Sequence, residues 1–132
     1  MGFRNAVLRA VPGAFILNSG IGKLGLPPEA AAGLQGAASK GIPQLAEIPA
    51  EQFGKMLAYG EIAVGAALLI PFVPTRLAGA ALATFATGLL AMYVRTPELT
   101  EKDGIRPSRA GVPIAKDSWL LAIGVALAVD PD

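Results

Sequence analysis

The chain has 132 residues, of which 53% are hydrophobic and 16% are charged, and its net charge is +1. This length suits a single domain, and the near-neutral charge gives no indication of a nucleic-acid partner. Because the sequence contains no Cys and no His, its own side chains exclude disulfides, thiol chemistry, iron–sulfur ligation and histidine-ligated haem. The positive mean hydropathy and the many Ala and Gly residues indicate helices that pack closely in a membrane.

Residues 3–24 are predicted to form the first membrane-spanning helix, with a kink at Pro12. The basic side chains of Arg4 and Arg9 are expected to extend to one membrane interface, and that of Lys23 to the other. This helix is shorter in apolar sequence than the two that follow.

A glycine-rich segment at the end of this helix, residues 20–25, matches the pattern G-x-G-x-x-G. Nucleotide binding through that pattern needs a preceding strand and a following helix, whereas Pro27 and Pro28 follow at once. We therefore interpret the segment as a helix end at the membrane surface. Asn18, just before it, is a polar group within the span and needs a partner.

Residues 27–50 are predicted to lie on the membrane interface as a short helical segment. Proline is tolerated in the first turn of a helix and an acidic residue is favoured there, so Pro28 and Glu29 indicate a helix start. The helix is expected over residues 30–40 and is ended by Gly41 and the proline that follows.

Two long apolar runs, residues 56–73 and 77–94, form the centre of the sequence. Each would be about 27 Å long as a helix, close to the thickness of the hydrocarbon layer of a bilayer. Only residues 74–76 separate the runs, which forces the two helices to lie antiparallel. The sequence therefore predicts a transmembrane hairpin with spans over about residues 53–73 and 77–94.

Small residues recur at a spacing of four in the second helix of this hairpin. Ala80, Thr84 and Gly88 form one such ridge, which predicts a surface for packing against another membrane helix. A ligand groove is the alternative interpretation. The adjacent row consists of Gly79, Ala83, Thr87 and Ala91.

Residues 95–113 form a polar, proline-containing loop that is expected outside the bilayer. A last helix is predicted over about residues 114–129, with Asp117 and Ser118 at its start. The chain is thus predicted to be all-α: one transmembrane domain over residues 1–132, an up-down bundle of four membrane-spanning helices with the interfacial segment between the first two.

In such a bundle, the connections 1–2 and 3–4 lie on the same side of the membrane. Glu61, a carboxylate about two turns into the second span, is expected to share a polar pocket near that side. The pocket would bind an acidic or quinone-like headgroup or relay a proton; the alternative is a structural ion pair with Lys23, Lys55 or Lys116. Its other predicted members are Asn18, Lys23, Lys55, Tyr93, Arg95, Lys116 and Asp117.

The orientation in the membrane stays open at this point. Lys and Arg residues are more numerous on the side of the two long loops, and positive-inside counting places those loops in the cytoplasm. The two arginines that precede the first span favour the opposite orientation.

Three segments resemble the DoxX-like family of small bacterial membrane proteins, of an actinobacterial type: FILNSGIGKLG, GEIAVGAALLIPFVPTRLAGAAL and AKDSWLLAIGVALAVD. The resemblance extends over nearly the whole chain and implies a four-helix bundle in the bacterial cytoplasmic membrane. It makes Lys23, Glu61, Lys116 and Asp117 the family-like polar positions. Some relatives belong to quinone-linked or other membrane oxidoreductase assemblies. A thiol redox role cannot be transferred, because this chain has no Cys.

These observations lead to three functional hypotheses. The first is a non-catalytic accessory subunit of a membrane redox system, with a quinone or a lipid headgroup at Glu61, no haem or covalent cofactor and no metal. The second is a small-solute or proton-coupled transporter, and the third is an assembly or scaffold factor. The expected partners are membrane lipids, oxidoreductase subunits or a second copy of the chain. A stand-alone enzyme is the least supported, because no nucleophile–base pair or metal-ligand spacing is visible.

Overall fold

The computed structural model describes residues 2–41, 43–95, 107–108 and 116–130. Within these residues the secondary-structure elements are all helices, which confirms the all-α prediction. Most of the predicted polar loop 95–113 lies outside the described residues. The helices are α1 (Phe3–Lys23), α2 (Pro28–Gly41), the 3-10 helix η1 (Pro43–Glu47), α3 (Ala50–Leu69), α4 (Thr75–Arg95) and α6 (Asp117–Ala128).

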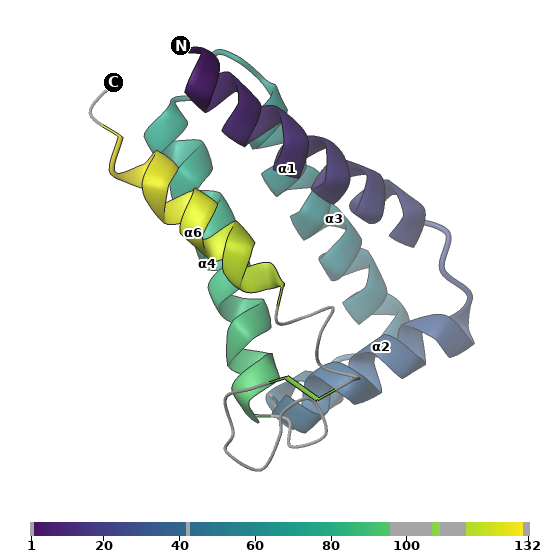
Figure 1. The fold of residues 1–132 in the computed structure, drawn as a ribbon. Helices are drawn as coiled ribbons and strands as arrows, with labels where there is room; N and C mark the ends of the chain where they lie inside the picture. The colour runs from purple at the N-terminus through teal and green to yellow at the C-terminus, as the bar shows by residue number, and fades with distance from the viewer. Residues whose placement is uncertain (1, 42, 96–106, 109–115, 131–132) are drawn as a thin grey trace.

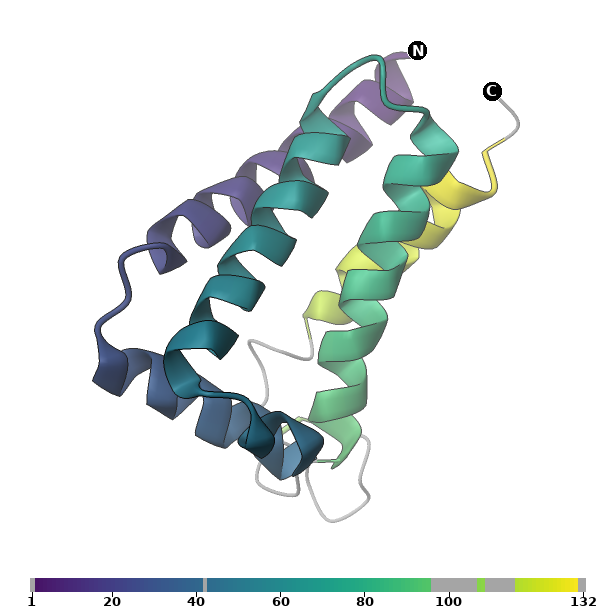
Figure 2. The same cartoon turned by 180° about the vertical axis from the view of Figure 1, so that it is seen from behind.

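Helices α1, α3, α4 and α6 form two helix pairs, α1 with α3 and α4 with α6, and the members of each pair are in extensive contact (Figure 1). Successive members of the set α1, α3, α4 and α6 run in opposite directions. Helix α2 lies across one end of the two pairs and contacts both α3 and α4 (Figure 2). The start of α1 and the end of α6 lie together at the other end (Figure 1).

Glycines allow α1 and α3 to approach closely. A Cβ atom added to Gly65 of α3 would lie 2.7 Å from the backbone nitrogen of Leu17 on α1. A Cβ atom added to Gly20 of α1 would lie 2.9 Å from the carbonyl oxygen of Ala58 on α3. Such distances are too short for any side chain, so both positions require glycine for this packing.

Glycines also allow α4 and α6 to approach closely. A Cβ atom on Gly79 of α4 would lie 2.8 Å from the carbonyl oxygen of Gly124 on α6, and one on Gly124 would lie 2.6 Å from the nitrogen of Ala83. The row that includes Gly79 and Ala83 therefore makes the contact between α4 and α6. The predicted ridge, Ala80, Thr84 and Gly88, is instead exposed, and its packing against another helix stays a prediction.

The hairpin between α3 and α4 differs from the prediction. Helix α3 ends at Leu69 rather than at residue 73, because Pro71 disfavours helical backbone at the residue before it. Ile70 accordingly has extended backbone, with ψ of 115°. The connection is therefore residues 70–74, longer than the predicted 74–76. Contacts between α3 and α4 are fewer than those within either pair, since the longer connection lets the two helices diverge.

Within the described part of the chain, no helix combines the length and the apolar character needed to cross a membrane. Helices α1, α3, α4 and α6 overlap the segments predicted to cross, but the insertion of these helices in a bilayer stays a prediction.

The distribution of side chains is unusual, because charged groups are buried while large apolar groups are exposed. The apolar core consists of Ile16, Leu68, Ala78, Leu82 and Leu127. The buried polar and charged residues are Asn5, Arg9, Glu61 and Asp130, all at most 5% exposed. Large aromatic and branched side chains are exposed instead, among them Phe3, Phe15, Phe72, Trp119 and Val129.

Candidate functional site

The centre of the candidate site is an ion pair between α1 and α3. The Nζ atom of Lys23 lies 3.0 Å from Oε1 and 3.2 Å from Oε2 of Glu61. Lys23 also donates a hydrogen bond of 2.6 Å to Oγ of Ser19, one turn earlier on α1. Of the three lysines considered as partners of Glu61, the structure therefore places Lys23 beside it.

Local helix geometry explains this arrangement. Residues 19 and 23 are four apart on α1 and so share one face of the helix. Gly20, between them, packs against Ala58 and Ile62, which lie on either side of Glu61 on α3. This close approach of the two backbones brings the lysine within reach of a carboxylate that is only 5% exposed.

Glu61, the acidic member of this ion pair, borders a cavity of about 310 Å³ between the two helix pairs. Its walls are mainly apolar, with two phenylalanine rings, and its polar groups are one hydroxyl and two carboxylates. Helices α1, α3, α4 and α6 all contribute to it. The lining residues are Phe15, Ile16, Ser19, Glu61, Phe85, Leu89, Asp117 and Leu120.

The charges of this cavity are unequal. The carboxylates of Glu61 and Asp117 both line it, and Lys23 is the base that contacts Glu61 among the described residues. Within the described part of the chain, Asp117 forms no ion pair of its own. Among the described residues, the cavity thus has one carboxylate that is paired with a lysine and one that is not.

Two members of the predicted pocket, Glu61 and Asp117, therefore line this cavity, and Lys23 contacts Glu61 without lining it. Lys55 pairs instead with Glu51, at 3.6 Å on the exposed face of α3. It lines a neighbouring cavity of about 260 Å³ that also includes Lys23. The remaining predicted members do not line the central cavity: Asn18, Arg95 and Lys116 are exposed, and the side chain of Tyr93 lies outside the described residues.

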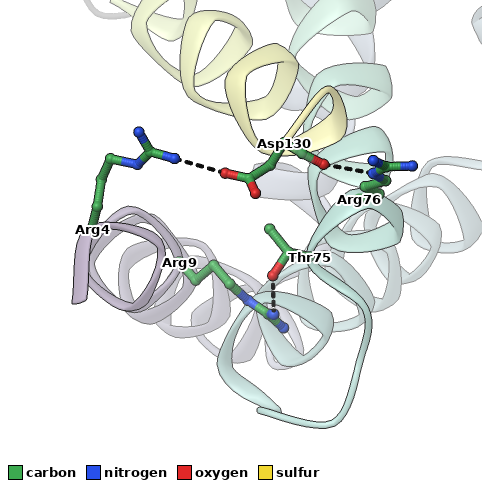
Figure 3. Close-up of polar contacts among 5 residues, drawn as sticks. All are labelled: Arg4, Arg9, Thr75, Arg76 and Asp130. Atoms are coloured by element: carbon green, nitrogen blue, oxygen red, sulfur yellow. Dashed lines mark hydrogen bonds and ion pairs between the residues drawn. The ribbon is translucent and has the colours of Figure 1, made fainter. Parts of the chain in front are cut away.

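Arg9 was predicted at a membrane interface, but the structure buries it to 2% exposure. Its Nε donates a hydrogen bond to the carbonyl of Leu68, and its Nη2 donates to those of Ala67 and Ile70, all at 2.9 Å. Its Nη1 donates to Oγ1 of Thr75 at 3.0 Å (Figure 3). The guanidinium therefore satisfies carbonyl groups at the end of α3 that have no partner within the helix.

Asp130 forms a second charged junction at the same end of the molecule. Its Oδ2 accepts a hydrogen bond of 2.9 Å from Nη2 of Arg4 on α1, and its backbone carbonyl accepts one of 2.6 Å from Nε of Arg76 on α4 (Figure 3). Arg4 was predicted to reach a membrane interface; it is exposed, as that requires, but it also binds Asp130.

Sequence reasoning missed both junctions. The available signal was Pro71, which predicts a helix end with unpaired carbonyls nearby. It could not identify the donor, because Arg9 is separated from these carbonyls by about sixty residues.

The described residues contain no group of three or more acidic side chains that could hold a metal ion. Comparison of the chain with models of protein families, with curated proteins and with solved structures found no match.

Proposed function

We propose that this chain is a multi-pass membrane protein that binds the head of a quinone-like ligand between its two helix pairs. In this role it is an accessory subunit of a membrane redox system. The observation that carries the proposal is a mainly apolar cavity lined by Glu61, a carboxylate that is paired with Lys23. The redox partner is suggested by the resemblance to DoxX-like proteins alone.

The distribution of side chains supports the membrane location. A lipid environment favours apolar groups on the outside, and ionisable groups within it face the interior and pair with one another or with carbonyls. Phe3, Phe72 and Trp119 are exposed to between 67% and 86%, whereas Arg9 and Glu61 are buried with partners. Glycine-mediated helix contacts are also typical of membrane bundles.

The chemistry of the cavity suits a ligand head that both accepts and donates hydrogen bonds. The hydroxyl of Ser19, which lines the cavity, can donate a hydrogen bond to a ligand carbonyl. The carboxylate of Asp117 can accept a hydrogen bond from a ligand hydroxyl. Phe15 and Phe85 provide the flat apolar contact that a ring requires.

The test is a native-nanodisc pull-down of the wild type, Glu61→Gln and Glu51→Gln, with proteins and extracted quinones identified by mass spectrometry. Glu51 is a matched control, because it is an exposed carboxylate on the same helix. We expect a quinone or an oxidoreductase subunit with the wild type and with Glu51→Gln, and its loss with Glu61→Gln. Recovery of neither with the wild type would overturn the proposal.

One observation favours a second candidate, a proton-coupled transporter. Two carboxylates line one cavity and only one of them is paired with a lysine among the described residues, an arrangement in which one acid can take up and release a proton. A flux assay in proteoliposomes separates the candidates: proton-coupled uptake that is lost in Glu61→Gln and in Asp117→Asn would favour transport.

The exposed ridge on α4 supports the third candidate, an assembly or scaffold factor, or a homo-oligomer. Because Ala80, Thr84 and Gly88 face outward, they are available to another helix. Gly88→Leu is expected to abolish a complex held by this ridge, whereas Glu61→Gln would leave it intact. Cross-linking in the membrane measures both.

A further inference from the structure

Another cavity, of about 290 Å³, lies at the end of the bundle opposite α2. We call it the Asn5 cavity. It lies between the first turns of α1 and the last turns of α6, far from the Lys23–Glu61 pair. The lining residues are Arg4, Asn5, Leu8, Ala126, Val129 and Asp130.

Asn5, one of the residues that line this cavity, has an unsatisfied acceptor. Asn5 is 3% exposed, and its Oδ1 atom is buried with no hydrogen-bond partner among the described residues. A buried acceptor without a donor is costly and rare, which points to a missing donor group. The cavity is many times larger than the roughly 30 Å³ that one water occupies in the liquid, so it has room for a larger polar group.

The charges on the cavity are arranged with the cation outside and the anion inside. The side chain of Arg4 is 74% exposed, whereas that of Asp130 is 3% exposed. The contact between them occupies one Nη2 atom of a guanidinium that has five N–H donors. An outer phosphate and an inner ammonium would complement this pattern with no net change in charge.

We propose that the Asn5 cavity binds the headgroup of a phosphoethanolamine lipid. The ammonium donates a hydrogen bond to Oδ1 of Asn5 beside the carboxylate of Asp130, and the phosphate binds Arg4. Phe3 and Val129 are 85% and 72% exposed at this end and provide apolar contact for the acyl chains. This inference rests on the membrane location given in the proposed function.

The proposal discriminates among lipids by their chemistry. A choline headgroup has the same charges, but its quaternary ammonium has no hydrogen to donate to Asn5. A glycerol headgroup has hydroxyl donors but no cation to place beside Asp130. Phosphatidylethanolamine should therefore bind more tightly than either lipid with the same acyl chains.

The experiment is native mass spectrometry of the full chain released from nanodiscs that contain the three lipids in equal amounts. We expect the wild type to retain phosphatidylethanolamine about tenfold over phosphatidylcholine, and Asn5→Leu to lose that preference. Asn18→Leu is the matched control, since Asn18 is an exposed asparagine on the same helix. Arg4→Gln should weaken the retention of both lipids, because both have a phosphate.

Equal retention of the three lipids by the wild type, or an unchanged preference in Asn5→Leu, would overturn the proposal. If Asn5→Leu does not fold, Arg4→Gln becomes the deciding variant, because the side chain of Arg4 is exposed and its replacement leaves the core intact. Soluble phosphoethanolamine that binds as tightly as the lipid would assign the site to a water-soluble ligand and overturn the lipid assignment.

Extraction of the membranes with alkaline carbonate distinguishes a failure of the Asn5 cavity proposal from a failure of the proposed function. Release of the chain into the extract would contradict the membrane location itself. Retention of the chain together with equal binding of all three lipids would overturn the Asn5 cavity proposal alone.

Discussion

Replacement of Arg9 by Met is expected to be among the most destabilising single changes in this chain. The substitution keeps an apolar stem of similar length but removes all four hydrogen bonds of the guanidinium. A hydrogen bond that involves a charged group contributes about 1.5–3 kcal/mol, and some of the freed carbonyls will regain water. We therefore expect a loss of about 3–5 kcal/mol in the free energy of unfolding.

For a chain of this size, that loss corresponds to a fall of at least about 10 °C in Tm, measured by circular dichroism in one detergent. Arg9→Lys should be intermediate, because one ammonium cannot reach all four acceptors. Lys55→Met, on the exposed face of α3, is the control and should change stability by less than about 0.5 kcal/mol. A Tm of Arg9→Met within about 2 °C of the wild type would refute the reasoning.

Two further predictions concern the helix contact and the ion pair. Gly65→Val is expected to force α1 from α3 and to cost at least about 2 kcal/mol, whereas Gly60→Ala, which meets open space, should be neutral or slightly stabilising. Equal melting temperatures for the two variants would contradict the close approach. Glu61→Gln is expected to cost about 1–3 kcal/mol because it leaves Lys23 without its charged partner. Denaturant titration measures this loss, and an unchanged midpoint would show that the pair does not stabilise the fold.

The sequence was sufficient to predict the positions of the helices, because apolar runs, prolines and glycines act locally. Predicted and observed helices begin and end within a few residues of each other except where Pro71 ends α3 early. Which helices pack against each other was harder to predict. The short connection suggested that α3 and α4 form a tight hairpin, but Gly65 and Gly124 direct each of them to another helix.

The candidate site was predicted only in part. Glu61 was identified because a carboxylate in an apolar run is costly, and Lys23 because it ends the neighbouring helix. The positions of Arg9 and Asn5 could not be predicted, since a side chain near the start of a helix can point to solvent, lipid or the interior. Only the tertiary packing decides among these.

The charged junctions of Arg9 and Asp130 are concentrated at one end of the molecule. They connect the two helix pairs at that end, so a rotation of one pair relative to the other would be centred there. Helix α4 has 21 residues and is therefore about 31 Å long. A rotation of about 5° around the fixed end would move its far end by about 3 Å, given that length. Leu89, which lines the central cavity, is about 21 Å from the start of the helix, so the same rotation would move it by about 2 Å.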